Sequence, residues 1–164
     1  MPDSNGLSPL PRTVLKPLRV KRCRSQYAAL PFKAVDGQLV VMLVTSRGTG
    51  RWIIPKGWPE KKLKPCDQAA REAYEEAGVL GRVAKTPFGS FSYEKRQAAR
   101  KPVRCLVDVY LLEVRRELED WPEKGQREKC WMPLAEAARL VSEPGLVEIF
   151  NNIDIRRLPG ARTP

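Results

Sequence analysis

The chain has 164 residues, a length that predicts one domain with a core large enough to fold without disulfide bonds. Thirty lysine and arginine residues against nineteen aspartate and glutamate residues give a formal net charge of +11, which favours anionic partners: phosphates, nucleic acid or acidic membranes. The four cysteines are far apart in the sequence and histidine is absent, so a zinc site, a Cys/His nucleophile and a disulfide framework are unsupported.

Membrane insertion and export are also unsupported by the sequence. No apolar run approaches the length of a membrane span, and the N-terminus lacks the apolar region of a secretory signal. We therefore expect a cytoplasmic protein with no membrane partner. Charge alone does not choose between a small polyphosphate and RNA, and it does not exclude that lysine and arginine merely solubilise the surface.

The first part of the chain predicts a tail followed by two strands. Residues 1–16 are rich in proline, serine and glycine, and a basic cluster follows them, so we expect a flexible basic tail over residues 1–22. Residues 26–33 predict a first strand. Asp36-Gly37 is a hairpin turn signal, and the continuous apolar run 39–45 predicts a buried second strand. Residues 46–51 predict a loop.

The stretch 52–79 predicts a short strand, a tight Pro-Lys-Gly loop and an acidic helix over 67–77. At about 100° per residue, Glu72, Glu75 and Glu76 fall on one face of that helix. Carboxylate oxygens of this kind suit Mg²⁺ or Mn²⁺ better than zinc. The alternative is a solvated acidic face, which is the usual fate of glutamates on a helix.

The predicted ends and apolar side of this helix complete the unit. Asp67 is the expected N-cap, and Gly78 is placed where helices commonly end in a left-handed residue. The residues roughly opposite the glutamates are small or aromatic and predict a stripe that packs on a sheet: Ala70, Ala73, Tyr74 and Ala77.

The rest of the chain predicts strands at 79–86, 88–94, 103–114 and 128–132, and helices at 134–141 and near 146–153. This order favours a mixed α/β sandwich, of the α+β type, over a wound βαβ sheet. We expect a single domain over residues 23–155 and a C-terminal tail over 156–164, with no internal repeat.

The stretch 57–79 resembles the signature of the Nudix hydrolases, G-x5-E-x7-R-E-U-x-E-E-x-G-U, in which U is a bulky apolar residue. Matching positions are Gly57, Arg71, Glu72, Glu75, Glu76, Gly78 and Val79, with Ala73 a weak fit to the first U. Shorter matches over residues 24–150 make the chain most similar to the diphosphoinositol polyphosphate phosphohydrolases, which also split dinucleoside polyphosphates.

The resemblance implies an α/β/α sandwich, with a mixed sheet between helices, and hydrolysis of a phosphoanhydride bond in a polyphosphorylated small molecule. It implies Mg²⁺ as cofactor, with Mn²⁺ as a substitute, held by Glu72, Glu75, Glu76 and the backbone carbonyl of Lys56. Glu72 and Arg71 are the catalytic candidates. The candidates for substrate binding flank the predicted cleft: Arg24, Arg47, Arg51, Lys56 and Gly57.

One position departs from the signature, because Leu63 stands where the family has a glutamate that pairs with the box arginine. Arg71 then needs another partner, and Glu60 and Glu72 are the two candidates. We expect metal binding to survive this change better than reaction rate. The general base is either Glu72 or a carboxylate from another loop, such as Glu94.

A second function is a catalytically weak Nudix module that binds phosphate-rich ligands or RNA through its basic surface. Leu63 and the net charge of +11 favour it, whereas the intact glutamate triplet favours the enzyme. Aromatic stacking motifs on a basic sheet, typical of RNA-binding modules, are absent from the sequence. We therefore favour the enzyme over nucleic-acid binding, and the sequence gives no oligomeric state.

Overall fold

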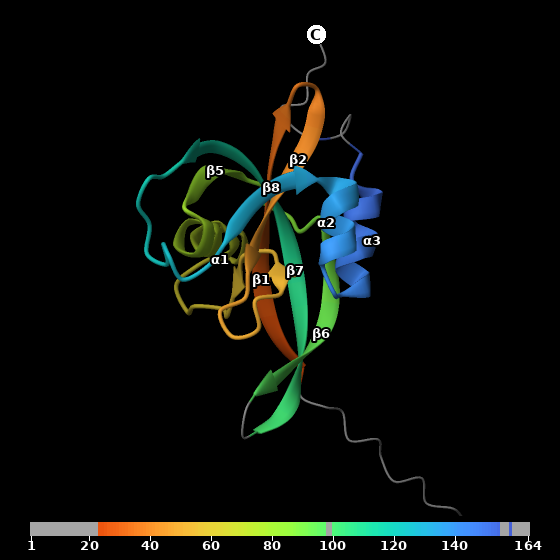
Figure 1. Cartoon of the computed structure of the whole chain (residues 1–164). Helices are drawn as coiled ribbons and strands as arrows, with labels where there is room; N and C mark the ends of the chain where they lie inside the picture. Colours follow the sequence, from red (N-terminus) through yellow and green to blue (C-terminus); the bar gives the residue numbers. More distant parts are fainter. Residues whose placement is uncertain (1–22, 98–99, 155–157, 159–164) are drawn as a thin grey trace, which may run out of the picture.

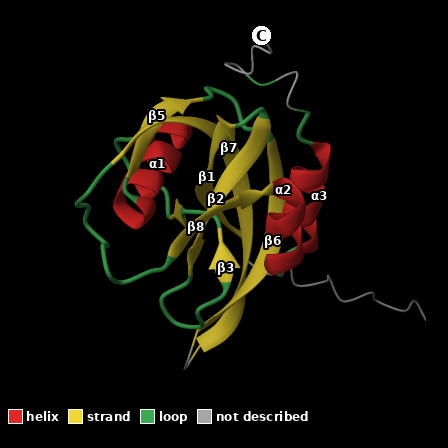
Figure 2. Ribbon diagram, turned by 45° about the horizontal axis from the view of Figure 1, so that its top comes forward, coloured by secondary structure: helices red, strands yellow, loops and turns green. Residues whose placement is uncertain are grey.

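The computed structural model describes residues 23–97, 100–154 and 158. They form one eight-stranded mixed sheet with helices on both faces (Figures 1 and 2). The strands are β1 (Cys23–Val35), β2 (Gln38–Thr45), β3 (Trp52–Ile53), β4 (Lys56–Gly57), β5 (Val79–Val83), β6 (Gly89–Gln97), β7 (Arg100–Glu117) and β8 (Lys129–Pro133). The helical segments are α1 (Pro65–Glu72), the π-helical turn η1 (Ala73–Ala77), α2 (Leu134–Leu140) and α3 (Pro144–Asn152). The predicted α/β sandwich is confirmed.

The main strands of the sheet follow the order β3-β2-β1-β7-β5. At its centre, β1 and β7 form a parallel pair. The other pairings are antiparallel: β4 with β1, β6 with β7, and β8 with β2. Strands β1 and β2 join through the two-residue turn Asp36-Gly37, and both of these residues have positive φ angles, 48° and 75°. This geometry is the type I′ hairpin that the Asp-Gly pair predicts.

Each face of the sheet has its own apolar core. One core packs α2 and α3 on the sheet and includes Leu30, Val107, Leu146 and Phe150. Leu158, beyond the predicted domain end at residue 155, is also buried there. The other core packs α1 and η1 on the opposite face through Cys66, Ala69, Ala73 and Ala77. Figure 1 shows α1 on one side of the strands and the pair α2/α3 on the other.

The acidic helix differs in three details from the prediction. It begins at Pro65, whose ring suits the first helical position, with Lys64 rather than Asp67 at the N-cap. Tyr74 is 37% exposed, because the buried stripe consists of small residues shifted toward Ala69. The α-helix stops at Glu72 and continues as a wider π-helical turn, a feature often found at functional sites.

The end of this helical unit is as predicted. Gly78 ends it with φ 66° and ψ 36°, in the left-handed region. The predicted tails, residues 1–22 and most of 156–164, lie outside the described residues. Within the described part of the chain, no helix is long and apolar enough to cross a lipid bilayer.

Candidate active site

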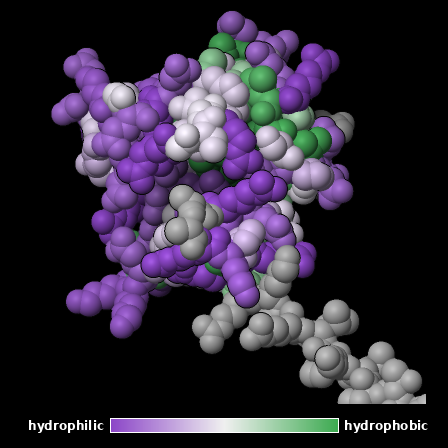
Figure 3. Space-filling view, turned by 60° about the horizontal axis from the view of Figure 1, so that its bottom comes forward, coloured by the Kyte–Doolittle hydropathy of each residue, from purple (hydrophilic) through white to green (hydrophobic). Residues whose placement is uncertain are grey.

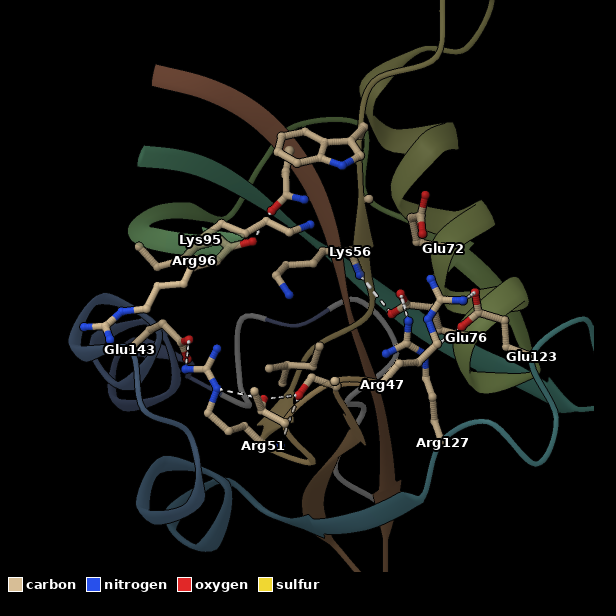
Figure 4. A pocket seen from close by; sticks show the side chains of 18 of the residues that line it. Arg47, Arg51, Lys56, Glu72, Glu76, Lys95, Arg96, Glu123, Arg127 and Glu143 are labelled. Atoms are coloured by element: carbon tan, nitrogen blue, oxygen red, sulfur yellow. Dashed lines mark hydrogen bonds and ion pairs between the residues drawn. The ribbon is translucent and has the colours of Figure 1, made fainter. Parts of the chain in front are cut away.

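A cleft of about 730 Å³ lies where the acidic helix, the loop 46–51, strand β6 and the segment 56–60 meet (Figure 4). The segment 56–60 contains β4 and is called the β4 loop below. The lining of the cleft also includes residues of the segment between β7 and β8 and Glu143 before α3. Six of the lining residues are acidic and six are basic. The cleft is therefore balanced in charge, although the whole chain has a net charge of +11.

Glu76 is the most buried acidic side chain of the cleft, with 7% of its surface exposed. Its Oε2 accepts a hydrogen bond of 3.3 Å from the backbone N–H of Lys56, and its Oε1 lies 2.6 Å from Nη2 of Arg127. Burial raises the pKa of Glu76 to about 7, and the positive charges of Arg127 and Lys56 oppose that rise. A cation beside this carboxylate would favour its charged form.

Arg127 connects three parts of the structure from a buried position. Besides Glu76, its guanidinium binds Glu123 Oε2 at 2.6 Å and the carbonyl oxygen of Thr45 at 2.9 Å. The segment that contains Arg127 is fixed to the acidic helix by backbone hydrogen bonds from Leu118 to Gly78 and from Glu123 to Glu75. Glu76 is thus held by a rigid partner that arrives from 51 residues away.

Glu72 lies against Gly57, at the point where the β4 loop passes the helix. A Cβ atom on residue 57 would be only 1.9 Å from Glu72 Oε1, so the glycine is what makes room for this carboxylate. Gln68, one turn earlier and fully buried, donates a 2.7 Å hydrogen bond to the same oxygen. Burial raises the pKa of Glu72 and the hydrogen bond from Gln68 opposes that rise.

Glu75 points elsewhere and does not line the cleft. Arg71 Nε binds Glu75 Oε1 at 2.7 Å, and Arg71 Nη1 binds Glu60 Oε2 at 2.8 Å. The expectation that all three glutamates share one face rested on 100° per residue, and the wider turn after Glu72 changes that spacing. Among the described residues, no group of three acidic, cysteine or histidine side chains is arranged to hold a metal ion.

The basic side chains of the cleft come from several elements, and Arg47 and Arg127 lie nearest to Glu76 (Figure 4). Arg47 lies near Glu123, at 3.6 Å, and Arg51 lies at 3.6 Å from Glu143. Lys56 occupies the middle of the cleft, with its ammonium 5.4 Å from the centre of the Tyr93 ring. Burial lowers the pKa of Lys56, and the charges of Glu76 and Glu143 oppose that effect.

Arg24 is not among the cleft-lining residues. Its guanidinium carbon lies 4.0 Å above the ring of Trp58, which does line the cleft, and the ammonium of Lys95 lies 4.9 Å from the same ring. The molecular face seen in Figure 3 is mostly hydrophilic, with the apolar residues gathered at one edge. The lining of the cleft is thus polar and mixed in charge rather than predominantly basic.

A family model described as the NUDIX domain matches residues 26–152, which is most of the chain. The chain belongs to the Nudix family. Two plant relatives and several animal relatives resemble this Nudix domain in sequence. Nudix hydrolase 12, mitochondrial, from Arabidopsis thaliana is 34% identical over 106 residues, which cover 63% of this chain and 52% of that protein.

Diphosphoinositol polyphosphate phosphohydrolase 3-beta from Homo sapiens is 31% identical over 120 residues, covering 72% of this chain and 69% of that protein. The protein of Rattus norvegicus named diphosphoinositol polyphosphate phosphohydrolase 2 is also 31% identical, with 72% and 63% covered. The Nudix chain spans about half to two thirds of the length of these curated relatives.

Solved structures show the same fold at low sequence identity. An Ap4A hydrolase of C. elegans, in a binary complex, superposes with a TM-score of 0.59 at 15% identity, covering 78% of this chain and 93% of that chain. A MutT protein of Methanosarcina mazei gives 0.60 at 18% identity, with 80% and 93% covered.

Leu63 stands in place of the signature glutamate, and Glu60 supplies a carboxylate to Arg71 instead. Arg71 pairs with Glu60, one of the two partners expected from the sequence, and not with Glu72. Leu63 N donates to the Glu60 carbonyl at 3.2 Å, so the loop folds back on itself and brings the Glu60 carboxylate to the arginine. Arg71 lies outside the cleft lining, where its contacts can orient the helix but do not reach a substrate.

A divalent cation fits two of the predicted metal ligands. Mg²⁺ usually keeps several waters and is bound by one or two carboxylates together with substrate phosphates. Glu72 and Glu76 line the same cleft as Lys56, and the space that Gly57 leaves beside the Glu72 carboxylate is consistent with such a site. Glu75 could join them only if its ion pair with Arg71 opened.

Several residues of the cleft were not found from the sequence. Arg127 and Glu123 approach the acidic helix through a long irregular segment that has no periodic pattern. Glu143, in the lining, and Gln68, which supports Glu72, each follow another polar residue, and no spacing rule distinguishes them from surface positions. Trp58, directly after the signature glycine, could have been noticed, because a tryptophan in a Pro/Gly loop has no strand or helix to pack it.

Proposed function

We propose that this Nudix protein is a Mg²⁺-dependent pyrophosphohydrolase that cleaves a phosphoanhydride bond in a polyphosphorylated small molecule. The observation that carries the proposal is that Glu72 and Glu76 lie in one cleft with Arg47, Arg51 and Lys56. Carboxylates that hold a cation, placed opposite basic side chains that hold phosphates, are what phosphoryl transfer to water needs. The relatives named as diphosphoinositol polyphosphate phosphohydrolases support the same reaction class.

The proposal assigns a task to each of these residues, and Glu72 and Lys56 each have two. Glu72, Glu76 and the Lys56 carbonyl would hold Mg²⁺, or Mn²⁺ in its place. When bound, the cation neutralises phosphate oxygens and makes an attacking water more acidic. Arg47, Arg51 and the Lys56 ammonium stabilise negative charge that develops on the phosphoryl oxygens.

In the reaction, the oxygen of a water molecule forms a bond to phosphorus, and the anhydride P–O bond breaks toward the leaving phosphate. The proton of the water passes to a carboxylate. We assign this role to Glu72, because it lies in the cleft beside Gly57, with Glu94 on β6 as the alternative lining carboxylate. Arg71 and Arg127 are positioning residues, which hold the helix and Glu76 respectively.

The test is turnover by the purified protein with Mg²⁺ on a panel of diadenosine polyphosphates, a diphosphoinositol polyphosphate, ADP-ribose and capped RNA. Glu76→Gln is the control that removes the proposed ligand, and Glu75→Gln is its matched neighbour. We expect hydrolysis of at least one compound, lost in Glu76→Gln and retained in part by Glu75→Gln. If no compound is hydrolysed in a Glu76-dependent way, while RNA binds tightly and in a salt-sensitive way, the protein is a binding module instead.

A further inference from the structure

Trp58 is an aromatic side chain of the cleft lining to which the proposed reaction gives no role. It follows Gly57 in the β4 loop, is only half-buried, and lines the cleft. Arg24 from β1 and Lys95 from β6 place their charged groups over its ring, at 4.0 and 4.9 Å from its centre. A large aromatic surface is therefore held next to the predicted metal ligands by two cations.

This arrangement has two explanations. In the first, the ring only props Arg24 and Lys95 into positions where they bind phosphates. In the second, the ring itself contacts a planar part of the substrate, because every nucleobase has a face that stacks on an aromatic side chain. The two explanations differ in which part of a ligand depends on Trp58.

The charge of the cleft indicates which of two substrate classes fits it better, a diphosphoinositol polyphosphate or a nucleoside polyphosphate. A diphosphoinositol polyphosphate has phosphates around its whole ring and offers no aromatic face, so it needs a strong excess of basic groups. The cleft instead has equal numbers of acidic and basic lining residues, and Arg127, one of its basic residues, is already paired with both Glu76 and Glu123. A nucleoside polyphosphate, with few phosphates and one or two uncharged bases, matches this balance better.

We propose that Trp58 is the stacking surface for the base of a nucleoside polyphosphate, so that nucleotides are preferred over diphosphoinositol compounds as ligands of the cleft. The substrate class named here rests on the function proposed above. Base binding displaces the Lys95 ammonium from the ring, since an exposed cation–π contact is weaker than base stacking. The displaced ammonium becomes available to bind phosphate, while Arg24 stays on the ring, 4.0 Å from its centre.

The test compares a ligand that carries adenosine groups with one that consists of phosphates alone. Binding to the full chain is measured by calorimetry with a methylene-bridged diadenosine polyphosphate, which is not cleaved at the bridge, and with inorganic tripolyphosphate. Trp58→Leu removes the aromatic face and keeps an apolar side chain, whereas Trp58→Phe keeps a smaller aromatic face. Thermal melting confirms that each variant is folded.

We expect Trp58→Leu to weaken binding of the adenosine compound about tenfold or more, and to leave tripolyphosphate within about twofold. Trp58→Phe should recover most of the loss. Equal losses for both ligands would show that the ring serves only to hold the cations, and unchanged adenosine binding would also overturn the proposal. So would tighter binding of a diphosphoinositol polyphosphate than of the adenosine compound by the unaltered protein.

The outcome is separate from that of the hydrolysis test. If the protein hydrolyses nothing but Trp58→Leu loses adenosine binding, the base site is supported and the proposed function is refuted. If the protein hydrolyses diphosphoinositol compounds without any dependence on Trp58, the proposed function is supported and the base site is refuted.

Discussion

Replacing Gly57 by alanine should test whether the position of the Glu72 carboxylate controls the reaction. Gly57 has no positive φ angle, so alanine fits its backbone without strain. The new methyl group would, however, lie 1.9 Å from Glu72 Oε1 and 2.2 Å from Glu72 Cδ. Since ordinary contacts begin near 3.4 Å, the carboxylate must retreat by about 1.5 Å.

A displacement of this size is large for a catalytic group. A misplacement of about 1 Å can cost about 100-fold in rate, which corresponds to about 2.7 kcal/mol of transition-state stabilisation. The atom that must move is the end of a flexible side chain rather than backbone, so the free energy of unfolding should change by less than about 1 kcal/mol. We therefore expect a kcat about 100-fold lower in a protein that remains folded.

The assay is hydrolysis of a diadenosine polyphosphate with saturating Mg²⁺, together with a thermal melt of each variant. Gly48→Ala is the matched control, because a Cβ at residue 48 meets nothing within 4 Å. A Gly57→Ala protein that melts normally and keeps its kcat within fivefold of the unaltered protein would refute the role of the Glu72 position.

Three further predictions concern the contacts around the acidic helix. Glu60→Ala should lower activity severalfold and leave the unfolding midpoint almost unchanged, because its ion pair with Arg71 is exposed. Adding Leu63→Glu should restore activity, and steady-state kinetics would contradict this if the double variant stayed as slow as the single one. Arg127→Met should lower the free energy of unfolding in urea by about 3 kcal/mol, because it leaves the buried Glu76 carboxylate without its partner. The double variant Arg127→Met/Glu76→Leu should recover most of that loss, and equal losses in the two variants would contradict the ion-pair argument. Gly78→Ala should destabilise the fold by about 2 to 4 kcal/mol and Gly125→Ala by about 1 kcal/mol. Both glycines have positive φ angles, but only at residue 78 would the new methyl group overlap the Trp121 ring, so Gly78→Ala should have the lower unfolding midpoint.

The elements of the sheet were predictable because their signals are local. The run 39–45 is continuously apolar, Asp36-Gly37 defines a two-residue turn, and Gly78 marks the end of the acidic helix. The start of that helix was wrong by two residues, because Pro65 rather than the Asp67 side chain determines it. These features depend on a few neighbouring residues, which is why spacing alone identifies them.

The arrangement of the cleft depended on information that spacing does not contain. The separation of Glu75 from Glu72 and Glu76 follows from a π-helical turn and from two arginines that compete for the carboxylates. The sequence left Glu60 and Glu72 as the two candidate partners of Arg71. Only the fold of the loop that contains Glu60 shows that Glu60 is the partner. Side chains from distant segments, Arg127 above all, have no sequence signature of their approach to the helix.

The parallel pairing of β1 with β7 has a consequence for how the protein is made. Residue 23 pairs with residue 104 and residue 32 with residue 113, so about 80 residues separate each partner pair. Contacts of such long range form late and slow the folding of a domain. The β1–β2 and β6–β7 hairpins can form while the chain is being synthesised, but Glu76 cannot meet Arg127 until the last quarter of the chain has begun to emerge. The carboxylates of the acidic helix thus exist before the cleft does, and catalytic competence should appear only with the last strands of the sheet.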